Sequence, residues 1–230
     1  MATILNTLKA KFQKIEFKAV IKKLFNDIMK EPFYILTHPI KGYTEFKTEG
    51  LRKNYVAIFY LMMMCLVQII SYNGTGFLVN NHNPNNFNSI KIISLVLVPV
   101  LLVTVGNWSI TSLFNGKGKM TEIFSLVTYS FAPYVWIMLP NIVYSNFLVI
   151  EEVAFYSAFA SIGVFLLGFM LFTGLLVIHE YGLFKTIITS IATIVAMGVI
   201  IFVVFLFLTV FQQVYSFLYS LYREYVMRFL

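Results

Sequence analysis

The sequence predicts an all-α, polytopic membrane protein with five transmembrane helices and amphipathic helices at both ends. Hydrophobic residues make up 59% of the 230-residue chain and charged residues only 12%, whereas soluble domains carry about 25% charged residues. The apolar residues form continuous runs, which excludes a β-barrel with its alternating strands of about 10 residues. A chain this apolar is also not a nucleic-acid-binding protein, despite its formal charge of +7.

A basic head occupies residues 1–53, which hold 11 of the 17 Lys and Arg residues. Apolar side chains recur with a helical period from Ile4 to Ala19, opposite Lys11, Lys14 and Lys18. From Phe17 the apolar stripe changes sides, so the helix either breaks there or contacts lipid on one face and protein on the other. Two roles stay open, an anchor on anionic lipid of the inner leaflet and a docking helix for a cytoplasmic partner. Residues 31–53 suit an irregular or short-helical bridge at the membrane interface.

The membrane domain spans residues 54–211. A bilayer core of about 30 Å takes roughly 20 apolar helical residues, and five windows qualify: 55–72, 90–114, 123–144, 153–178 and 187–211. The third window contains Pro133 and Pro140. We therefore expect a kink or a partly unwound segment in it.

The loops predict the orientation of the spans. The head and the loops 115–122 and 179–186 contain lysine, whereas the loops 73–89 and 145–152 contain no Lys or Arg. Because positive loops stay in the cytoplasm, we expect the N-terminus inside and the C-terminus outside. The expected location is the plasma membrane. Arg223 and Arg228 on the outside are exceptions to this rule.

The C-terminal tail, residues 212–230, has an apolar, aromatic face running from Val214 to Phe229. Two structures are compatible with this pattern. The tail either forms a separate helix at the outer interface, or it extends the fifth span outward toward a partner.

The residues show no catalytic, cofactor or metal site, so we expect no enzyme. The three histidines, His38, His82 and His179, fall in separate polar segments. We expect each of them at a solvated or capping position, too far apart to share a metal. Gly116-Lys117-Gly118 lacks the length and the following Ser or Thr of a phosphate-binding loop.

Small and polar residues within the spans indicate helix packing. Asn107 and its polar neighbours suit hydrogen bonds between helices. Ala154 with Ala158, Ser157 with Ser161, and Ala192 with Ala196 are small residues four apart, a spacing that lets helices approach closely. We expect Ala158, Ser161, Ala192 and Ala196 to contact partner helices, either in other membrane subunits or in an oligomer of this chain.

Several short motifs resemble the Ypt-interacting-protein (YIP) domain family over roughly residues 31–211. They are His38-Pro39-Ile40-Lys41-Gly42-Tyr43, Asn107-Trp108-Ser109, the turn Asn115-Gly116-Lys117-Gly118, Tyr129-Ser130-Phe131-Ala132-Pro133-Tyr134 and Leu139-Pro140. The resemblance adds Trp108, Gly116, Lys117, Gly118, Tyr129 and Pro133 to Asn107 as candidate contact or packing residues.

The resemblance implies a function in membrane contacts. The eukaryotic branch of the family binds prenylated Rab GTPases through an acidic head with a tyrosine-glycine-proline signature, which this basic head lacks. Bacterial members are often encoded beside sugar ABC transporters. The expected function is therefore a non-catalytic accessory subunit with ABC permease chains as possible partners. The alternative is a self-contained oligomeric permease or channel for small solutes.

Overall fold

The computed structural model describes residues 22–48 and 52–229, and this part of the chain is helical without strands. The head contains a π-helical turn, η1, and two short helices, α2 and α3; short 3-10 turns, η2 and η3, precede two of the long helices. The elements are η1 (Asn26–Lys30), α2 (Glu31–Thr37), α3 (Pro39–Thr48), α4 (Asn54–Gly74), η2 (Pro84–Asn86), α5 (Ser89–Leu113), α6 (Met120–Tyr129), α7 (Ala132–Tyr144), η3 (Ile150–Glu152), α8 (Val153–Ile178) and α9 (Leu183–Phe229). Within the described residues, five segments are long and apolar enough to cross a membrane. The all-α, five-span prediction is confirmed.

The third span consists of two helices, α6 and α7, as its prolines predicted. The backbone leaves the α6 helix at Ser130 and Phe131. There the Phe131 N–H donates to the Thr128 carbonyl over 3.2 Å, which closes a turn tighter than that of an α-helix. Pro133 lies in the first turn of α7, where its missing N–H costs no helical hydrogen bond. This span is the most deeply buried of the five, and α4, α5 and α8 pack against it.

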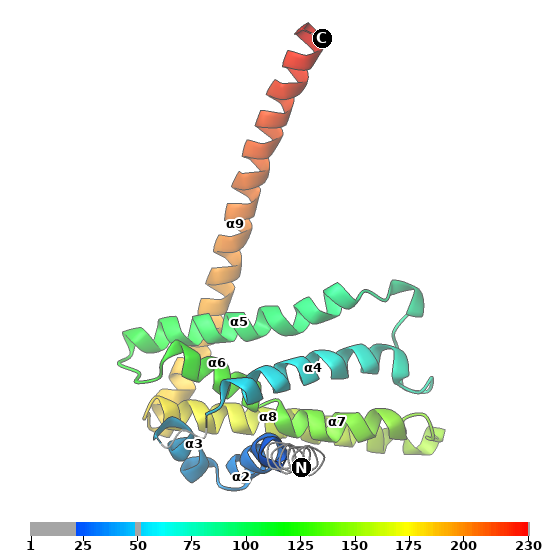
Figure 1. Cartoon of the computed structure of the whole chain (residues 1–230), viewed down its shortest axis with the longest axis vertical. Coiled ribbons are helices and arrows are strands. Elements are labelled where there is room, and N and C mark those ends of the chain that lie inside the picture. The colour runs from blue at the N-terminus through cyan, green and yellow to red at the C-terminus, as the bar shows by residue number, and fades with distance from the viewer. Residues whose placement is uncertain (1–21, 49–51, 230) are drawn as a thin grey trace, which may run out of the picture.

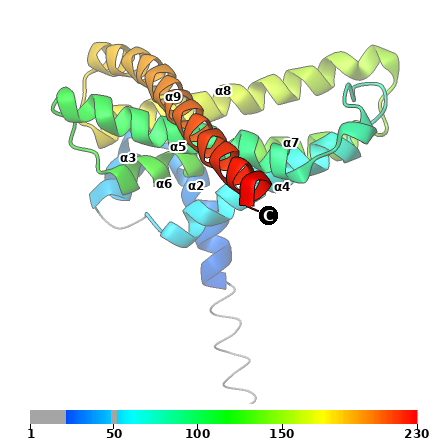
Figure 2. The same cartoon turned by 90° about the horizontal axis from the view of Figure 1, so that it is seen from above.

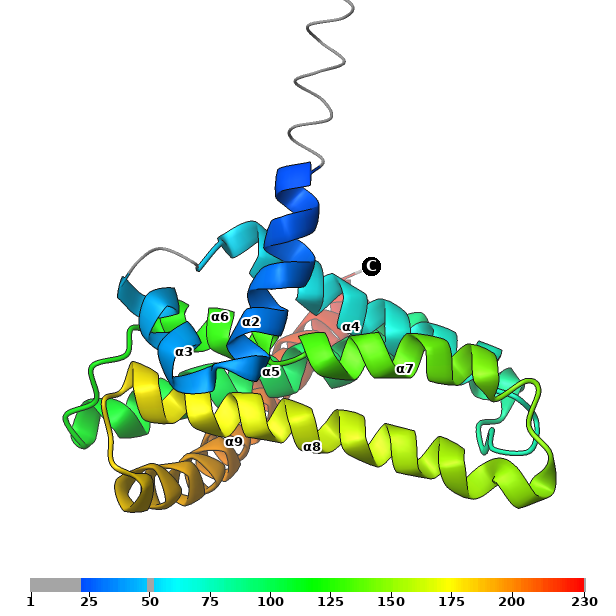
Figure 3. The same ribbon diagram turned by 90° about the horizontal axis from the view of Figure 1, so that it is seen from below.

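The long helices α4, α5, α7 and α8 run alongside one another, with α2 and α3 against one side of them (Figure 1, Figure 3). At one end, Asn146 Nδ2 donates to the Gly74 carbonyl over 2.8 Å and the Gly76 N–H donates to Ser145 Oγ over 2.8 Å. The loop after α4 and the turn after α7 therefore share this end. The turns after α5 and α8 share the other end, where Gly118 contacts His179.

Part of the head belongs to the core. Phe46 of α3 packs its ring edge-on against Tyr129 of α6, with ring centroids 5.0 Å apart. The ring centroids of Tyr60 in α4 and Trp136 in α7 are 6.3 Å apart. Phe46, Tyr60 and Tyr129 are fully buried. The short-helical bridge expected for residues 31–53 is present as α2 and α3, and it also supplies packing that the pattern of the head did not indicate. Residues 1–21, which carry the first stripe and the start of the second, lie outside the described residues.

The last helix, α9, extends far beyond the others. It continues without interruption from the fifth span through the aromatic tail, so the tail extends the span and forms no separate interface helix. The first part of α9 packs on α5, where a Cβ on Gly106 would lie 3.2 Å from Met197 Cγ. The helix crosses α5 steeply there, and its second part leaves the bundle (Figure 1, Figure 2).

Candidate functional site

Two helix ends meet at the end of the bundle that carries the Gly116-Lys117-Gly118 turn. After α8, Glu180 takes a left-handed conformation with φ 56°, and the Tyr181 N–H bonds back to the Leu176 carbonyl over 3.0 Å. After α5, Asn115 has φ 55° and the Gly116 N–H bonds back to the Thr111 carbonyl over 2.7 Å. Both helices thus end in the αL cap that turns the chain sharply, and the two turns lie against each other.

The side chain of His179 fills the space between these turns. The Gly118 N–H donates to His179 Nδ1 over 3.3 Å, and His179 Nε2 lies 3.0 Å from Asn107 Oδ1. A Cβ on Gly116 would come within 2.7 Å of His179 Nδ1, and one on Gly118 within 2.7 Å of His179 Cε1. The two glycines are therefore required by the close approach of the imidazole ring.

Hydrogen bonds continue from His179 into the membrane domain. Because Nδ1 accepts from Gly118, we assign the ring proton to Nε2, which donates to Asn107 Oδ1. Asn107 Nδ2 donates to Thr193 Oγ1 of α9 over 3.1 Å, and Thr193 donates to the Thr189 carbonyl over 2.7 Å. We call Asn107, Gly116, Gly118, His179 and Thr193 the His179 junction. The inter-helix hydrogen bond expected of Asn107 is confirmed, between α5 and α9.

The His179 junction holds its histidine neutral. His179 is 1% exposed, and burial, together with the positive charge of Lys47, lowers the pKa of His179 to about 4. Both ring nitrogens have partners in the neutral form, whereas a second ring proton would displace the Gly118 N–H. The arrangement joins α5, α8, α9 and the glycine turn.

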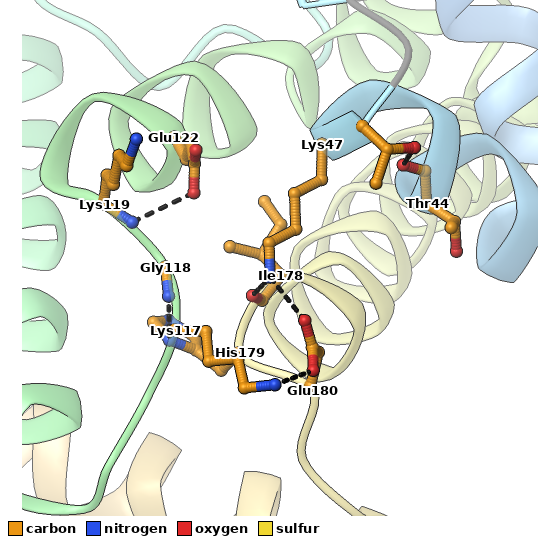
Figure 4. Close-up of polar contacts among 10 residues, drawn as sticks. Thr44, Lys47, Lys117, Gly118, Lys119, Glu122, Ile178, His179 and Glu180 are labelled. Atoms are coloured by element: carbon orange, nitrogen blue, oxygen red, sulfur yellow. Dashed lines mark hydrogen bonds and ion pairs between the residues drawn. The ribbon is translucent and has the colours of Figure 1, made fainter.

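At the surface of the same end of the bundle, two lysines bind the residues that end α8 (Figure 4). Lys47 of α3 donates to the Ile178 carbonyl over 2.8 Å and to Glu180 Oε1 over 2.9 Å, and Lys117 of the glycine turn pairs with Glu180 Oε2. Hydrogen bonds from Lys117 and Lys47 lower the pKa of the exposed Glu180 carboxylate to about 2. Lys117, predicted as a contact residue, thus links the glycine turn to the α8 end and keeps an exposed surface.

A second polar group joins the head to the first span. Lys53 pairs with Asp27 over 2.7 Å and with Glu31, and the Tyr129 hydroxyl accepts from the Lys53 N–H over 3.1 Å. Burial opposes ionisation of Asp27, but hydrogen bonds from Lys53 and Tyr55 outweigh it and lower the Asp27 pKa. For Glu31 burial dominates and raises the pKa. The buried Tyr129 side chain therefore helps to hold the C-terminal end of the head against the bundle.

The other predicted contact residues lie apart from the His179 junction. Pro133 is buried in α7, Ala158 and Ser161 are exposed on α8, and Trp108 is 44% exposed on α5. Ala192 and Ala196 are half-buried on α9. Ala158 and Ser161 thus have room for a neighbouring helix, and their role toward a partner stays a prediction.

The sequence did not predict the burial of one histidine. His38 and His82 are exposed, but His179, although it caps α8, is buried rather than solvated. A histidine directly after an apolar span looks like a loop residue. The available signal was the pair of small glycines in the other turn at the same end, together with an intramembrane Asn107 that needed a partner. In the part of the chain described, no three His, Cys, Asp or Glu side chains gather as metal ligands would.

The helices and their fastened ends define an α-helical, five-span integral membrane protein. Residues 33–222 match the Yip1 domain, and the chain belongs to the Yip1 domain family. No curated protein and no solved structure matches the chain. The matched region runs from α2 into the tail of α9 and includes the His179 junction, so the resemblance to the family is confirmed, whereas a bacterial origin stays a prediction.

Proposed function

We propose that this protein is a non-catalytic adaptor that acts by contact with other membrane proteins. The Yip1 domain family is not a known family of enzymes. The hydrogen bonds of the His179 junction and the ion pairs of Glu180 and Lys53 join elements of the chain to one another. They support a role as a rigid framework that presents its outer surfaces.

The outer part of α9 is the observation that carries this proposal. From residue 201 to residue 225 every side chain is exposed, including Phe202, Phe205 and Phe207. The helix has 47 residues and is therefore about 70 Å long, whereas a bilayer core is about 30 Å thick. Residues 201–211 are apolar all round except for Thr209, and such a helix lies in lipid or among other helices. The whole of α9 reaches further than one crossing needs.

The exposed small residues support the same conclusion. Ala158 and Ser161 present a narrow strip on α8, where the backbone of another helix can approach closely. Integral membrane subunits are the partners that suit such surfaces, among them the permease chains of a carbohydrate ABC transporter or a second copy of this chain. The basic head would contact anionic lipid or a soluble component at the inner leaflet of the plasma membrane.

The permease alternative requires a polar pathway through the spans. Asn107, Thr104 and Thr111 are the buried polar side chains of α5, and each has an internal hydrogen-bond partner. Their bonds support packing over solute transport.

Purification in a mild detergent, with identification of co-eluting chains, tests the adaptor proposal. Wild-type protein should elute with a stoichiometric membrane partner, and Ala158→Leu with Ser161→Leu should weaken this association. The matched control is Val164→Leu, an exposed residue of the same helix outside the small-residue strip. Saturable solute movement by the purified protein alone in liposomes would replace the adaptor proposal with the permease.

A further inference from the structure

A cavity of about 660 Å³ lies between α4, α5, α6 and α8, beside the loop that joins α4 to α5. Its deep wall is apolar and includes Val100, Val103, Val127 and Leu171. This cavity is at the opposite end of α5 from the His179 junction, and neither the head nor the small-residue strips contribute to it.

The mouth of the cavity is polar and built by the loop. The His82 ring stacks on Tyr72 with centroids 4.5 Å apart, and the Tyr72 hydroxyl donates to the Asn83 carbonyl over 2.9 Å. Gln68, Tyr72, His82 and Lys91 all line the cavity here. The lining therefore changes from polar at the membrane surface to apolar toward the middle of the spans.

Lys91 gives the mouth a positive charge. It is exposed in the first turns of α5, and no carboxylate among the residues that line the cavity faces it. Every ion pair found in residues 22–48 and 52–229 involves other side chains. An anionic group at the mouth would supply the missing partner.

The volume decides between a lipid and a helix as the occupant. A membrane-spanning helix about 10 Å wide and 30 Å long occupies roughly 2,400 Å³, which is more than three times the volume of the cavity. Small-molecule sites range over about 300–1,000 Å³, which includes this one. The outer part of α9 from a second copy is thus too large, whereas an acyl chain with part of its headgroup fits.

We propose that this cavity binds one anionic phospholipid, with its phosphate at Lys91 and an acyl chain against Val103, Val127 and Leu171. The polar mouth at the membrane surface and the apolar depth match the polarity of a phospholipid in the adjacent leaflet. The site is distinct from the attraction of the basic head to anionic lipid, because it lies at the other end of the bundle.

Native mass spectrometry of the delipidated full-length protein, titrated with phosphatidylglycerol or phosphatidylcholine, tests this proposal. The wild type should retain one phosphatidylglycerol more tightly than phosphatidylcholine. Lys91→Gln should weaken phosphatidylglycerol binding about fivefold, the ratio that corresponds to about 1 kcal/mol for one basic residue near a membrane surface. Lys41→Gln, which removes an exposed lysine of the head, is the control and should leave this site unchanged.

Variants that fill the cavity test the acyl-chain position. Val103→Phe or Leu171→Phe should reduce binding of both lipids at this site, whereas Leu101→Phe on the exposed side of α5 should not. Equal effects of Lys91→Gln and Lys41→Gln would overturn the proposal. Unchanged lipid binding in a filled variant that elutes as the wild type does, or a preference for phosphatidylcholine, would overturn it as well. Lys91→Gln changes only an exposed side chain, so it decides the question even if a filled variant does not fold.

Discussion

The backbone N–H of Gly118 bonds to Nδ1 of His179 over 3.3 Å, and this contact fastens the turn after α5 to the end of α8. The ring and the turn are in close contact, because a Cβ on Gly118 would lie 2.7 Å from both His179 Cε1 and Ile178 Cγ2. In this chain, the glycines of the YIP-like turn thus leave the space that the buried His179 ring occupies.

Substituting this glycine should destabilise the bundle. We expect Gly118→Ala to cost about 1–3 kcal/mol, the usual effect of forcing an extra methyl group into a packed interior. Gly182→Ala is the matched control, since a Cβ there meets nothing within 4 Å. Thermal unfolding in detergent, followed by circular dichroism, measures both. Equal melting temperatures for the two variants would refute the close-contact explanation.

Removing the amide of Asn107 should also lower stability. Asn107→Ala would leave the His179 Nε2–H group buried without its acceptor and Thr193 without its donor, and an unsatisfied buried group costs about 1–3 kcal/mol. Ser109→Ala is the control, because Ser109 is exposed and donates only to the Val105 carbonyl of its own helix. The same unfolding assay applies. A Ser109→Ala loss as large as that of Asn107→Ala would contradict the assigned role.

The buried histidine predicts a pH dependence of stability. Burial and Lys47 lower the pKa of His179 to about 4, whereas an unfolded histidine titrates near 6.5. Between these values the unfolded chain binds a proton that the folded chain does not, so the free energy of unfolding rises with pH. Lowering the pH from about 7 to about 4 should therefore reduce stability, by no more than about 3 kcal/mol from this group.

Variants separate this contribution from other titrating groups. His179→Gln should be less stable at pH 7 but should lose less on acidification than the wild type does, whereas His82→Gln, an exposed histidine, should retain the wild-type slope. Glu180, whose pKa is lowered to about 2, also contributes near the acid end of this window, because the unfolded carboxyl group binds a proton there while the folded one does not. This contribution is common to the wild type and His179→Gln, so the difference between their slopes reports His179. An unchanged slope in His179→Gln would show that another group controls the pH dependence.

Periodicity and hydropathy predicted much of the fold because burial in a bilayer leaves a strong pattern. The spans begin and end within a few residues of α4, α5 and α8, and the break before Pro133 follows from proline chemistry. The core role of Phe46 and the burial of His179 depend on contacts between segments far apart in the sequence. No local pattern encodes them, just as the aromatic tail alone could not decide between a separate helix and an extension of α9.

The alternation of the loops also makes a topology prediction. The structure places Asn81 and Glu152 at one end of the bundle and Lys119 at the other, as the lysine distribution requires. In a Cys65→Ser background, single cysteines at Asn81 and Glu152 should react with an impermeant thiol reagent from outside the cell. Cysteines at Lys23 and Lys119 should stay unlabelled until the membrane is permeabilised. Labelling of Lys119 from outside would invert the proposed orientation.

The most direct test of the adaptor proposal is photo-crosslinking from the exposed part of α9 in native membranes. A photoreactive amino acid at Phe207, which is 69% exposed, should give one protein adduct of defined mass, either with another membrane subunit or with a second copy. The same group at Ile123, which is 0% exposed, should give only adducts within the chain. If probes placed all round α9 from residue 201 to residue 225 yield lipid adducts alone, α9 has no protein partner and the contact proposal is contradicted.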